Sequence, residues 1–111
     1  METLLVFTNL PDAASARAIA SSLIEQRLAA CVNILGPCRS IYRWQGKIEA
    51  AEEVPLLIKT TVDSYAALEE AIRAQHPYEL PEIVAVPVAS GLPAYLDWVI
   101  QECETGEEPA P

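Results

Sequence analysis

Two long extended segments joined by a tight turn constrain this fold more than any other feature of the sequence. The first segment runs from Cys31 to Trp44, the turn is Gln45-Gly46, and the return segment runs from Lys47 to about Thr61. A two-residue loop that contains Gly is typical of a β-hairpin, because Gly adopts positive φ without steric cost. Gly36-Pro37 and Pro55 predict kinks or bulges in these strands, since Pro cannot donate a ladder hydrogen bond.

The rest of the chain alternates short apolar strands with helices that carry apolar residues at helical spacing. The predicted elements are a strand over Thr3–Thr8, a helix over Asp12–Leu28, a helix capped by Thr61 or Asp63 and ended by His76-Pro77, a strand over Ile83–Val88, and a last helix that begins near Pro93. The order β-α-β-β-α-β followed by a helix predicts an α+β, ferredoxin-like split βαβ fold, with a four-stranded antiparallel sheet covered by two helices on one face. We predict one domain over residues 1–103 and a disordered acidic tail over residues 104–111.

The length of the hairpin predicts an oligomer. Cys31 to Trp44 spans 14 residues, or about 45 Å at ~3.3 Å per residue, whereas a compact domain of this size has a radius of gyration of only ~13 Å. A projecting hairpin exposes backbone edges that another chain can pair with, and its far end carries apolar and aromatic residues suited to an interface, namely Ile41, Tyr42, Trp44 and Ile48. The alternative is a hairpin that curls back over its own sheet.

Charge and composition exclude several classes of partner. The 111 residues carry a net charge of −9 with only seven Lys and Arg, so neither nucleic acid nor an acidic membrane surface is an expected partner. No apolar run approaches the ~20 residues that cross a bilayer, and the first residues do not resemble a secretory signal. We therefore expect a cytoplasmic protein. Its three cysteines form no CxxC pair, which favours reduced thiols over a disulfide framework or a zinc ribbon.

Several segments, taken in order, are similar to the CutA family of divalent-cation tolerance proteins. They are Ala29-Ala30-Cys31-Val32-Asn33, Tyr42-Arg43-Trp44-Gln45-Gly46-Lys47-Ile48, Leu57-Ile58-Lys59-Thr60-Thr61, His76-Pro77-Tyr78-Glu79-Leu80-Pro81-Glu82-Ile83 and Tyr95-Leu96-Asp97-Trp98. The resemblance covers about Leu4 to Val99 and implies a ferredoxin-like subunit, a homotrimer built through the hairpin strands, and a role in tolerance to copper and other divalent metals. Family members described as copper binders can carry a Cys at the end of the first strand and a His-His pair before Pro-Tyr. The matching positions here are Thr8 and Gln75-His76.

The candidate metal ligands are His76, Cys31 and Glu79. His76 is the only histidine, and an imidazole with a neighbouring carboxylate such as Glu79 or Glu82 could hold Cu(II) or another divalent metal. The alternative for His76 is a helix-terminal residue that interacts with the last carbonyls, and the alternative for Cys31 is a small core residue. Neighbouring subunits could supply further ligands.

Catalysis finds no support, because the sequence contains no GxSxG, HExxH, P-loop or GxGxxG motif. We expect a protein that is not an enzyme. Three functions are open: divalent-cation tolerance by a homotrimer, a trimeric signalling or small-molecule-binding module with clefts between subunits, and a partner-binding scaffold. The acidic side chains Glu49, Glu52 and Glu53 could form a weak carboxylate site for a cation. We predict a solvated face of the hairpin instead, because three acids that are near in sequence need not converge.

Overall fold

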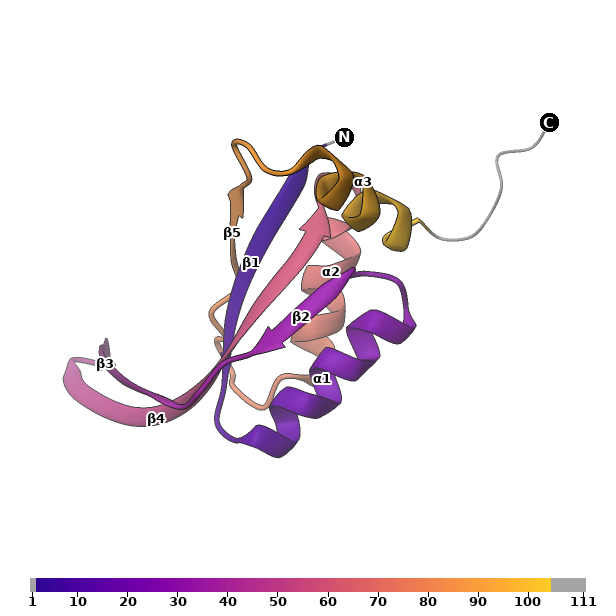
Figure 1. Ribbon diagram of the computed structural model, residues 1–111. Coiled ribbons are helices and arrows are strands. Elements are labelled where there is room, and N and C mark those ends of the chain that lie inside the picture. Colours follow the sequence, from indigo (N-terminus) through magenta and orange to yellow (C-terminus); the bar gives the residue numbers. More distant parts are fainter. Residues whose placement is uncertain (1, 105–111) are drawn as a thin grey trace.

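The computed structural model describes residues 2–104 of the chain. The elements follow the order β1 (Thr3–Leu10), α1 (Ala13–Glu25), β2 (Cys31–Ile34), β3 (Cys38–Trp44), β4 (Lys47–Thr61), α2 (Val62–Gln75), β5 (Val84–Pro87) and α3 (Pro93–Glu102) (Figure 1). The acidic tail predicted over residues 104–111 lies outside the described residues, apart from Glu104.

The strands form an antiparallel sheet in the order β2-β4-β1-β5. Helices α1 and α2 contribute apolar side chains to one core with β1 and β4, and they lie together on one face of the sheet (Figure 1). This arrangement confirms the predicted α+β, ferredoxin-like fold.

The prediction of a four-stranded sheet was wrong in one respect. The segment from Cys31 to Trp44 is two strands, β2 and β3, because Gly36-Pro37 interrupts it, and both strands pair with the long strand β4. The sheet therefore has five strands. A Pro at this position removes a ladder hydrogen bond, which explains why one continuous strand cannot form.

The helix ends are set by local chemistry. The Asp12 carboxylate accepts a hydrogen bond from the Ser15 N–H at 2.7 Å, so Asp12 caps α1 as predicted. This hydrogen bond also lowers the pKa of Asp12. The helix ends before the predicted Leu28 because Arg27 adopts a φ of 58°, outside the helical region. Thr61, one of the two predicted residues, caps α2.

The core is aliphatic and lies between the sheet and the two helices. Strand residues that point to the helices alternate with residues that point away, as a half-covered sheet requires. The fully buried side chains include Val6, Leu10, Ile19, Leu23, Leu56, Ile58, Leu68 and Ile72. The residues on the other face of β1 and β4 are only half-buried, and that face is covered by neither α1 nor α2.

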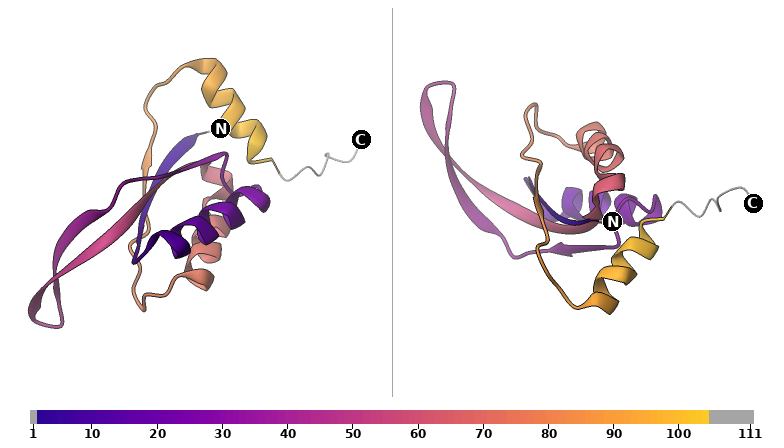
Figure 2. Two further views of the ribbon diagram at one scale, coloured as in Figure 1. Left: turned by 60° about the horizontal axis from the view of Figure 1, so that its bottom comes forward. Right: turned by 90° about the horizontal axis from the view of Figure 1, so that it is seen from above.

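The β3–β4 hairpin projects away from the body of the subunit (Figure 2). Its turn contains Gln45 with φ 50° and Gly46 with φ 80°, both positive, as the predicted two-residue hairpin turn requires. The subunit is elongated, measuring 56 × 28 × 23 Å with a radius of gyration of 15.1 Å. The hairpin thus projects instead of curling over its own sheet.

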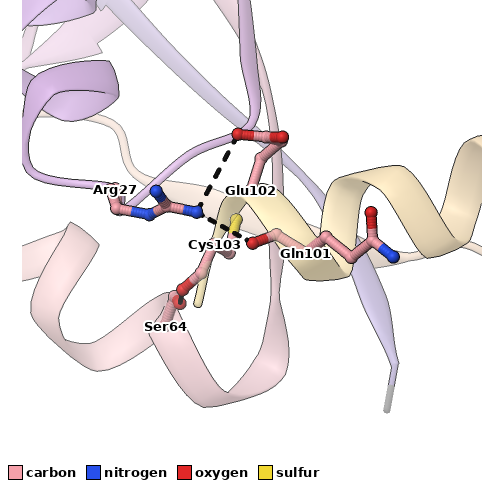
Figure 3. A network of polar contacts seen from close by, with 5 residues as sticks. All are labelled: Arg27, Ser64, Gln101, Glu102 and Cys103. Atoms are coloured by element: carbon pink, nitrogen blue, oxygen red, sulfur yellow. Dashed lines mark hydrogen bonds and ion pairs between the residues drawn. The ribbon is translucent and has the colours of Figure 1, made fainter. Parts of the chain in front are cut away.

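Helix α3 is tied to the ends of α1 and α2 (Figure 3). The Arg27 guanidinium donates a hydrogen bond to the Gln101 carbonyl at 3.0 Å and lies 3.9 Å from the Glu102 carboxylate. The Ser64 hydroxyl, in the first turn of α2, donates to the Cys103 carbonyl at 3.5 Å. These contacts satisfy carbonyls at the C-terminus of α3 that the helix leaves without partners. None of the helices in the described part of the chain is both long enough and apolar enough to span a bilayer.

Candidate functional site

A cavity of about 1020 Å³ lies between the hairpin and the loop that follows α2. The hairpin contributes Ser40, Ile41, Tyr42, Trp44, Ala51 and Glu53, β1 contributes Asn9, and the loop contributes residues 77–82. The cavity therefore brings together two segments that are far apart in the sequence, the hairpin and the loop that begins with Pro77-Tyr78. A concave site of this size that combines apolar walls with a few polar groups is suited to a small ligand.

Most hairpin residues that line the cavity share one face. In the β3–β4 ladder, Ser40 lies opposite Ala51 and Tyr42 lies opposite Glu49, so Ser40 and Tyr42 point to the same side. Ile41 and Ile48 belong to the alternate set of positions on the other face, although Ile41 also reaches the cavity edge. They are 71% and 72% exposed. We call the face that carries Ser40 and Tyr42 the concave face of the hairpin, and the face that carries Ile41 and Ile48 the convex face.

Glu53 is the most deeply buried acidic residue at the cavity, with 8% of its surface exposed. Burial, together with the adjacent Glu53 carboxylate, which accepts from the phenol and repels its anion, raises the pKa of Tyr78 to about 12. The phenol and the carboxylate thus face each other across the cavity wall. The prediction of a solvated face was wrong for Glu53, because the loop at Tyr78 covers it.

The cavity lining is negatively charged. Glu53, Glu79 and Glu82 line it, and no Lys or Arg is among the lining residues. The only ion pair within residues 2–104 joins Arg27 to Glu102, at α3 and far from the hairpin in the fold. The carboxylates of the cavity therefore have no cationic partner in the described part of the subunit.

His76 lies beside the cavity and is a structural link in this subunit. The residue is 8% exposed. Nε2 lies 2.7 Å from the Asn9 carbonyl, and Nδ1 accepts a hydrogen bond from the Tyr78 N–H at 3.1 Å. A carbonyl can only accept, so Nε2 carries the proton and donates to Asn9. The ring also packs against Tyr78, with ring centroids 4.9 Å apart. Both ring nitrogens are engaged, one at the end of β1 and one in the loop.

Cys31 lies in a different part of the sheet. Cys31 lies opposite Lys59 of β4, and Lys59 lies opposite Leu5 of β1. His76 instead contacts Asn9, which is four residues farther along β1. That offset is roughly 13 Å along the strands. The Lys59 ammonium donates to Cys31 Sγ at 3.9 Å, and burial together with the adjacent Cys31 thiol raises the pKa of Tyr95.

The three predicted ligands do not converge within one subunit. Glu79 lines the cavity, His76 uses both nitrogens inside the protein, and Cys31 lies at the other end of the sheet. Metal–ligand bonds of about 2.0 to 2.3 Å cannot join groups so placed. Residues 2–104 also contain no cluster of three or more His, Cys, Asp or Glu side chains placed to hold an ion. A metal held by all three residues would need ligands from more than one subunit.

Asn9, Glu53 and Tyr78 are among the cavity residues that lie outside the predicted set of metal ligands. Strand alternation does place Glu53 and Asn9 on the face of the sheet that α1 and α2 leave uncovered. The sequence carries no signal for the return of the loop at Tyr78 to that face, since the contact joins residues that are far apart in the chain.

Comparison with known proteins agrees with the fold. A family model described as "CutA1 divalent ion tolerance protein" matches residues 4–102. The "Divalent-cation tolerance protein CutA" of Thermus thermophilus is 50% identical over 99 residues, which cover 89% of this chain and 95% of that protein. "Protein CutA" of Mus musculus is 46% identical over 89% of this chain, which spans 56% of the mouse protein. The crystal structure of CutA from Xylella fastidiosa superposes with a TM-score of 0.91 at 46% identity, covering 94% of this chain and all (100%) of that chain.

Proposed function

The chain belongs to the CutA1 family of divalent ion tolerance proteins, and from that premise we propose that it works as a homotrimer that associates weakly with Cu(II) or another divalent cation. The observation that carries this proposal is the family match over residues 4–102, which includes part or all of every element of the fold. An acidic cavity without a cationic partner, formed by residues that the fold brings together, supports it.

Exposed apolar surface supports the homotrimer. On the convex face of the hairpin, Ile41 and Ile48 are more than two-thirds exposed, and on the uncovered side of the sheet Val84 and Val86 are 49% and 44% exposed. Burying such side chains stabilises an assembly by about 25 cal/mol per Å² of apolar surface. The exposed edge of a projecting hairpin also favours pairing with another chain.

Replacement of Ile41 and Ile48 by Lys tests the assembly. We expect the double variant to lose the trimer, because two charges would be placed in an interface core. Light scattering after gel filtration measures the mass. The matched control is Ile24→Lys, which changes an exposed Ile on α1 in the helix layer and should leave the trimer intact. A wild-type protein that elutes as a monomer would contradict the proposed assembly.

The metal part of the proposal rests on carboxylates and on ligands shared between subunits. One subunit cannot hold a metal ion with Cys31, His76 and Glu79 together. Both nitrogens of His76 are engaged within the protein, and Cys31 lies in another part of the sheet. Hard divalent cations take carboxylate oxygens, and Glu53, Glu79 and Glu82 line one cavity. The expected binding is weak because these side chains do not form a closed set of ligands.

Native mass spectrometry with Cu(II) titrated into the metal-free protein measures assembly and metal stoichiometry together. One metal per trimer would support ligands shared between subunits, and one per subunit would support a site within each chain. We expect Glu79→Gln and Cys31→Ser to lower the occupancy, and Glu70→Gln on the exposed face of α2 to leave it unchanged. A trimer that stays metal-free throughout the titration would contradict direct metal handling.

A second candidate function is a trimeric signalling or small-molecule-binding module. The cavity of about 1020 Å³ favours it, since the volume far exceeds that of a single ion. A ligand that binds only the folded protein raises its melting temperature. A melting screen with metabolites and nucleotides, compared with divalent metals, therefore distinguishes the two functions.

We propose a cytoplasmic protein without enzymatic activity and without a nucleic-acid or membrane partner, in keeping with a net charge of −9. Cell fractionation with an antibody to the protein tests the location, and gel-shift assays at low salt test the exclusion of nucleic acid.

A further inference from the structure

We propose that Cys31 and Lys59 form a redox modification site, at which hydrogen peroxide oxidises the thiol and the lysine amine then closes a covalent sulfur–nitrogen bond between β2 and β4. This inference goes beyond the proposed function. It depends neither on metal binding nor on the cavity at the hairpin, because neither residue lines that cavity.

The register of the sheet brings the two side chains together. Cys31 lies directly opposite Lys59 in the β2–β4 ladder, so both side chains project from the same face of the sheet. Lys59 Nζ lies 3.9 Å from Cys31 Sγ, slightly beyond the ~3 to 3.5 Å at which reacting atoms are well placed. A small rotation of the lysine side chain therefore brings the amine within reach of the sulfur.

The surroundings of Lys59 direct its nitrogen to the thiol. The chain carries 16 Asp and Glu, yet within residues 2–104 the single ion pair joins Arg27 to Glu102. The Lys59 nitrogen instead donates to the Cys31 sulfur and to the side-chain oxygen of Asn33, from alternate positions of β2 that share one face. Two contacts from one strand thus hold the amine over the sulfur, where no carboxylate draws it away.

Cys31 is also within reach of a small oxidant. It is only partly buried, and β2 is an edge strand of the sheet (Figure 1). The apolar surfaces that support the trimer are the convex face of the hairpin and the exposed side chains of β5, which forms the opposite edge. Three strand spacings, roughly 14 Å, separate β2 from β5. Hydrogen peroxide is hardly larger than water, so the reaction requires no ligand cavity.

The reaction balances with hydrogen peroxide as the oxidant. The Cys31 thiol takes one oxygen atom from peroxide, so the sulfur loses two electrons, and sulfenic acid and water form. The free amine of Lys59 then attacks that sulfur. The S–N bond forms, the S–O bond breaks, and the hydroxide leaves with a proton from the nitrogen as a second water. Sulfenic acids condense with thiols and with nitrogen in this way. Two molecules of an added thiol reverse the bond and leave as their disulfide.

The other two cysteines provide contrasts within the same chain. Cys38 is partly buried, as Cys31 is, but its sulfur lies 3.8 Å from the Ser40 hydroxyl and contacts no lysine among the described residues. Cys103 is buried against Thr60, and burial raises the pKa of its thiol. Peroxide should therefore oxidise Cys38 without a cross-link and should leave Cys103 largely reduced.

Peptide mapping by mass spectrometry tests the inference on the assembled, full-length protein, kept metal-free with a chelator. The protein is treated with hydrogen peroxide, then with catalase and iodoacetamide, and is digested with trypsin without a reductant. The new bond blocks cleavage at Lys59, so residues 28–39 should appear joined to residues 48–73. The joined mass should be about 2 Da below the sum of the two peptides, with alkylation of Cys38 counted.

The contact between Cys31 and Lys59 sets the expected yield. We expect the joined peptide to exceed any lysine adduct of Cys38 by at least about tenfold, because only Cys31 has an amine held beside its sulfur. Dithiothreitol added before digestion should abolish the joined peptide.

Variants assign the two partners. Lys59→Arg keeps the positive charge and removes the reactive amine, so the joined peptide should disappear and Cys31 should accumulate as sulfinic acid. The matched control Cys38→Ser removes the other partly buried thiol and should leave the yield of the joined peptide unchanged. The map of the wild-type protein decides the question even if Lys59→Arg does not fold.

Three results would overturn the inference. The first is a wild-type Cys31 that is recovered as a free thiol or as sulfinic acid, with normal cleavage at Lys59. The second is a joined peptide that persists in folded Lys59→Arg. The third is a joined peptide about 16 Da heavier than expected, because an oxygen atom retained between the two residues would exclude a direct sulfur–nitrogen bond.

Discussion

Replacement of His76 by Ala is expected to destabilise the fold strongly, even in the absence of any metal. The variant removes the donor to the Asn9 carbonyl and the acceptor for the Tyr78 N–H, which lie at 2.7 and 3.1 Å. Each hydrogen bond contributes about 1 kcal/mol, and partners left buried and unpaired cost more. The ring pair with Tyr78 adds roughly 0.5 to 1 kcal/mol. The expected loss in the free energy of unfolding is about 2 to 4 kcal/mol, a factor of at least about 30 in the unfolding equilibrium constant.

Urea denaturation of the metal-free protein, followed by circular dichroism, measures this loss. Protein concentration must be held fixed, because the stability of an oligomer depends on it. The control is Glu70→Gln, which changes an exposed side chain on α2 and should change the free energy by no more than about 0.5 kcal/mol. If His76→Ala unfolds at the wild-type midpoint with an unchanged slope, the structural role is refuted. Loss of Cu(II) uptake in such a stable variant would instead identify His76 as a ligand.

Three further predictions test other parts of the fold. Thr8→Val should stabilise the protein by about 1 kcal/mol in the same denaturation assay, because the buried Thr8 hydroxyl has no hydrogen-bond partner within the described residues and Val has almost the same shape. Destabilisation would show that the hydroxyl has a partner in the assembly. Gly46→Ala should lower the free energy of unfolding by about 1 kcal/mol, because Gly46 has a φ of 80° that Ala rarely adopts. A thermal melt at fixed protein concentration measures this change, and an unchanged melting temperature would contradict the prediction. Absorbance titration should show that Tyr78 ionises near pH 12, with a lower pKa in Glu53→Gln. Because the ordinary value is 10.0, the stability that this phenol contributes is complete below pH 10 and is lost as the pH rises towards 12; a Tyr78 that titrates at the ordinary value would contradict burial against Glu53.

Local sequence chemistry was sufficient for the order of elements and for most of their ends. Gln45-Gly46 predicted the hairpin turn, Asp12 predicted the start of α1, and Pro93 predicted the first turn of α3. Each of these signals depends on backbone preferences and hydrogen bonds within a few residues, so the chain carries them wherever the segment lies. Where prediction failed locally, at the break between β2 and β3, the signal at Gly36-Pro37 was present but was interpreted as a kink instead of an end.

The candidate site depended on contacts that no local pattern encodes. His76 was predicted as a metal ligand with a helix-terminal role as the alternative, yet its partner Asn9 lies 67 residues away. Glu53 was predicted to face solvent, and it is buried because the loop at Tyr78 returns to the hairpin. The sequence by itself determined the elements and the exposed hairpin, since periodicity and turn chemistry act over short distances. Only the tertiary structure decided which imidazole nitrogens are occupied and which carboxylate is buried, because both follow from the packing of segments that are distant in the chain.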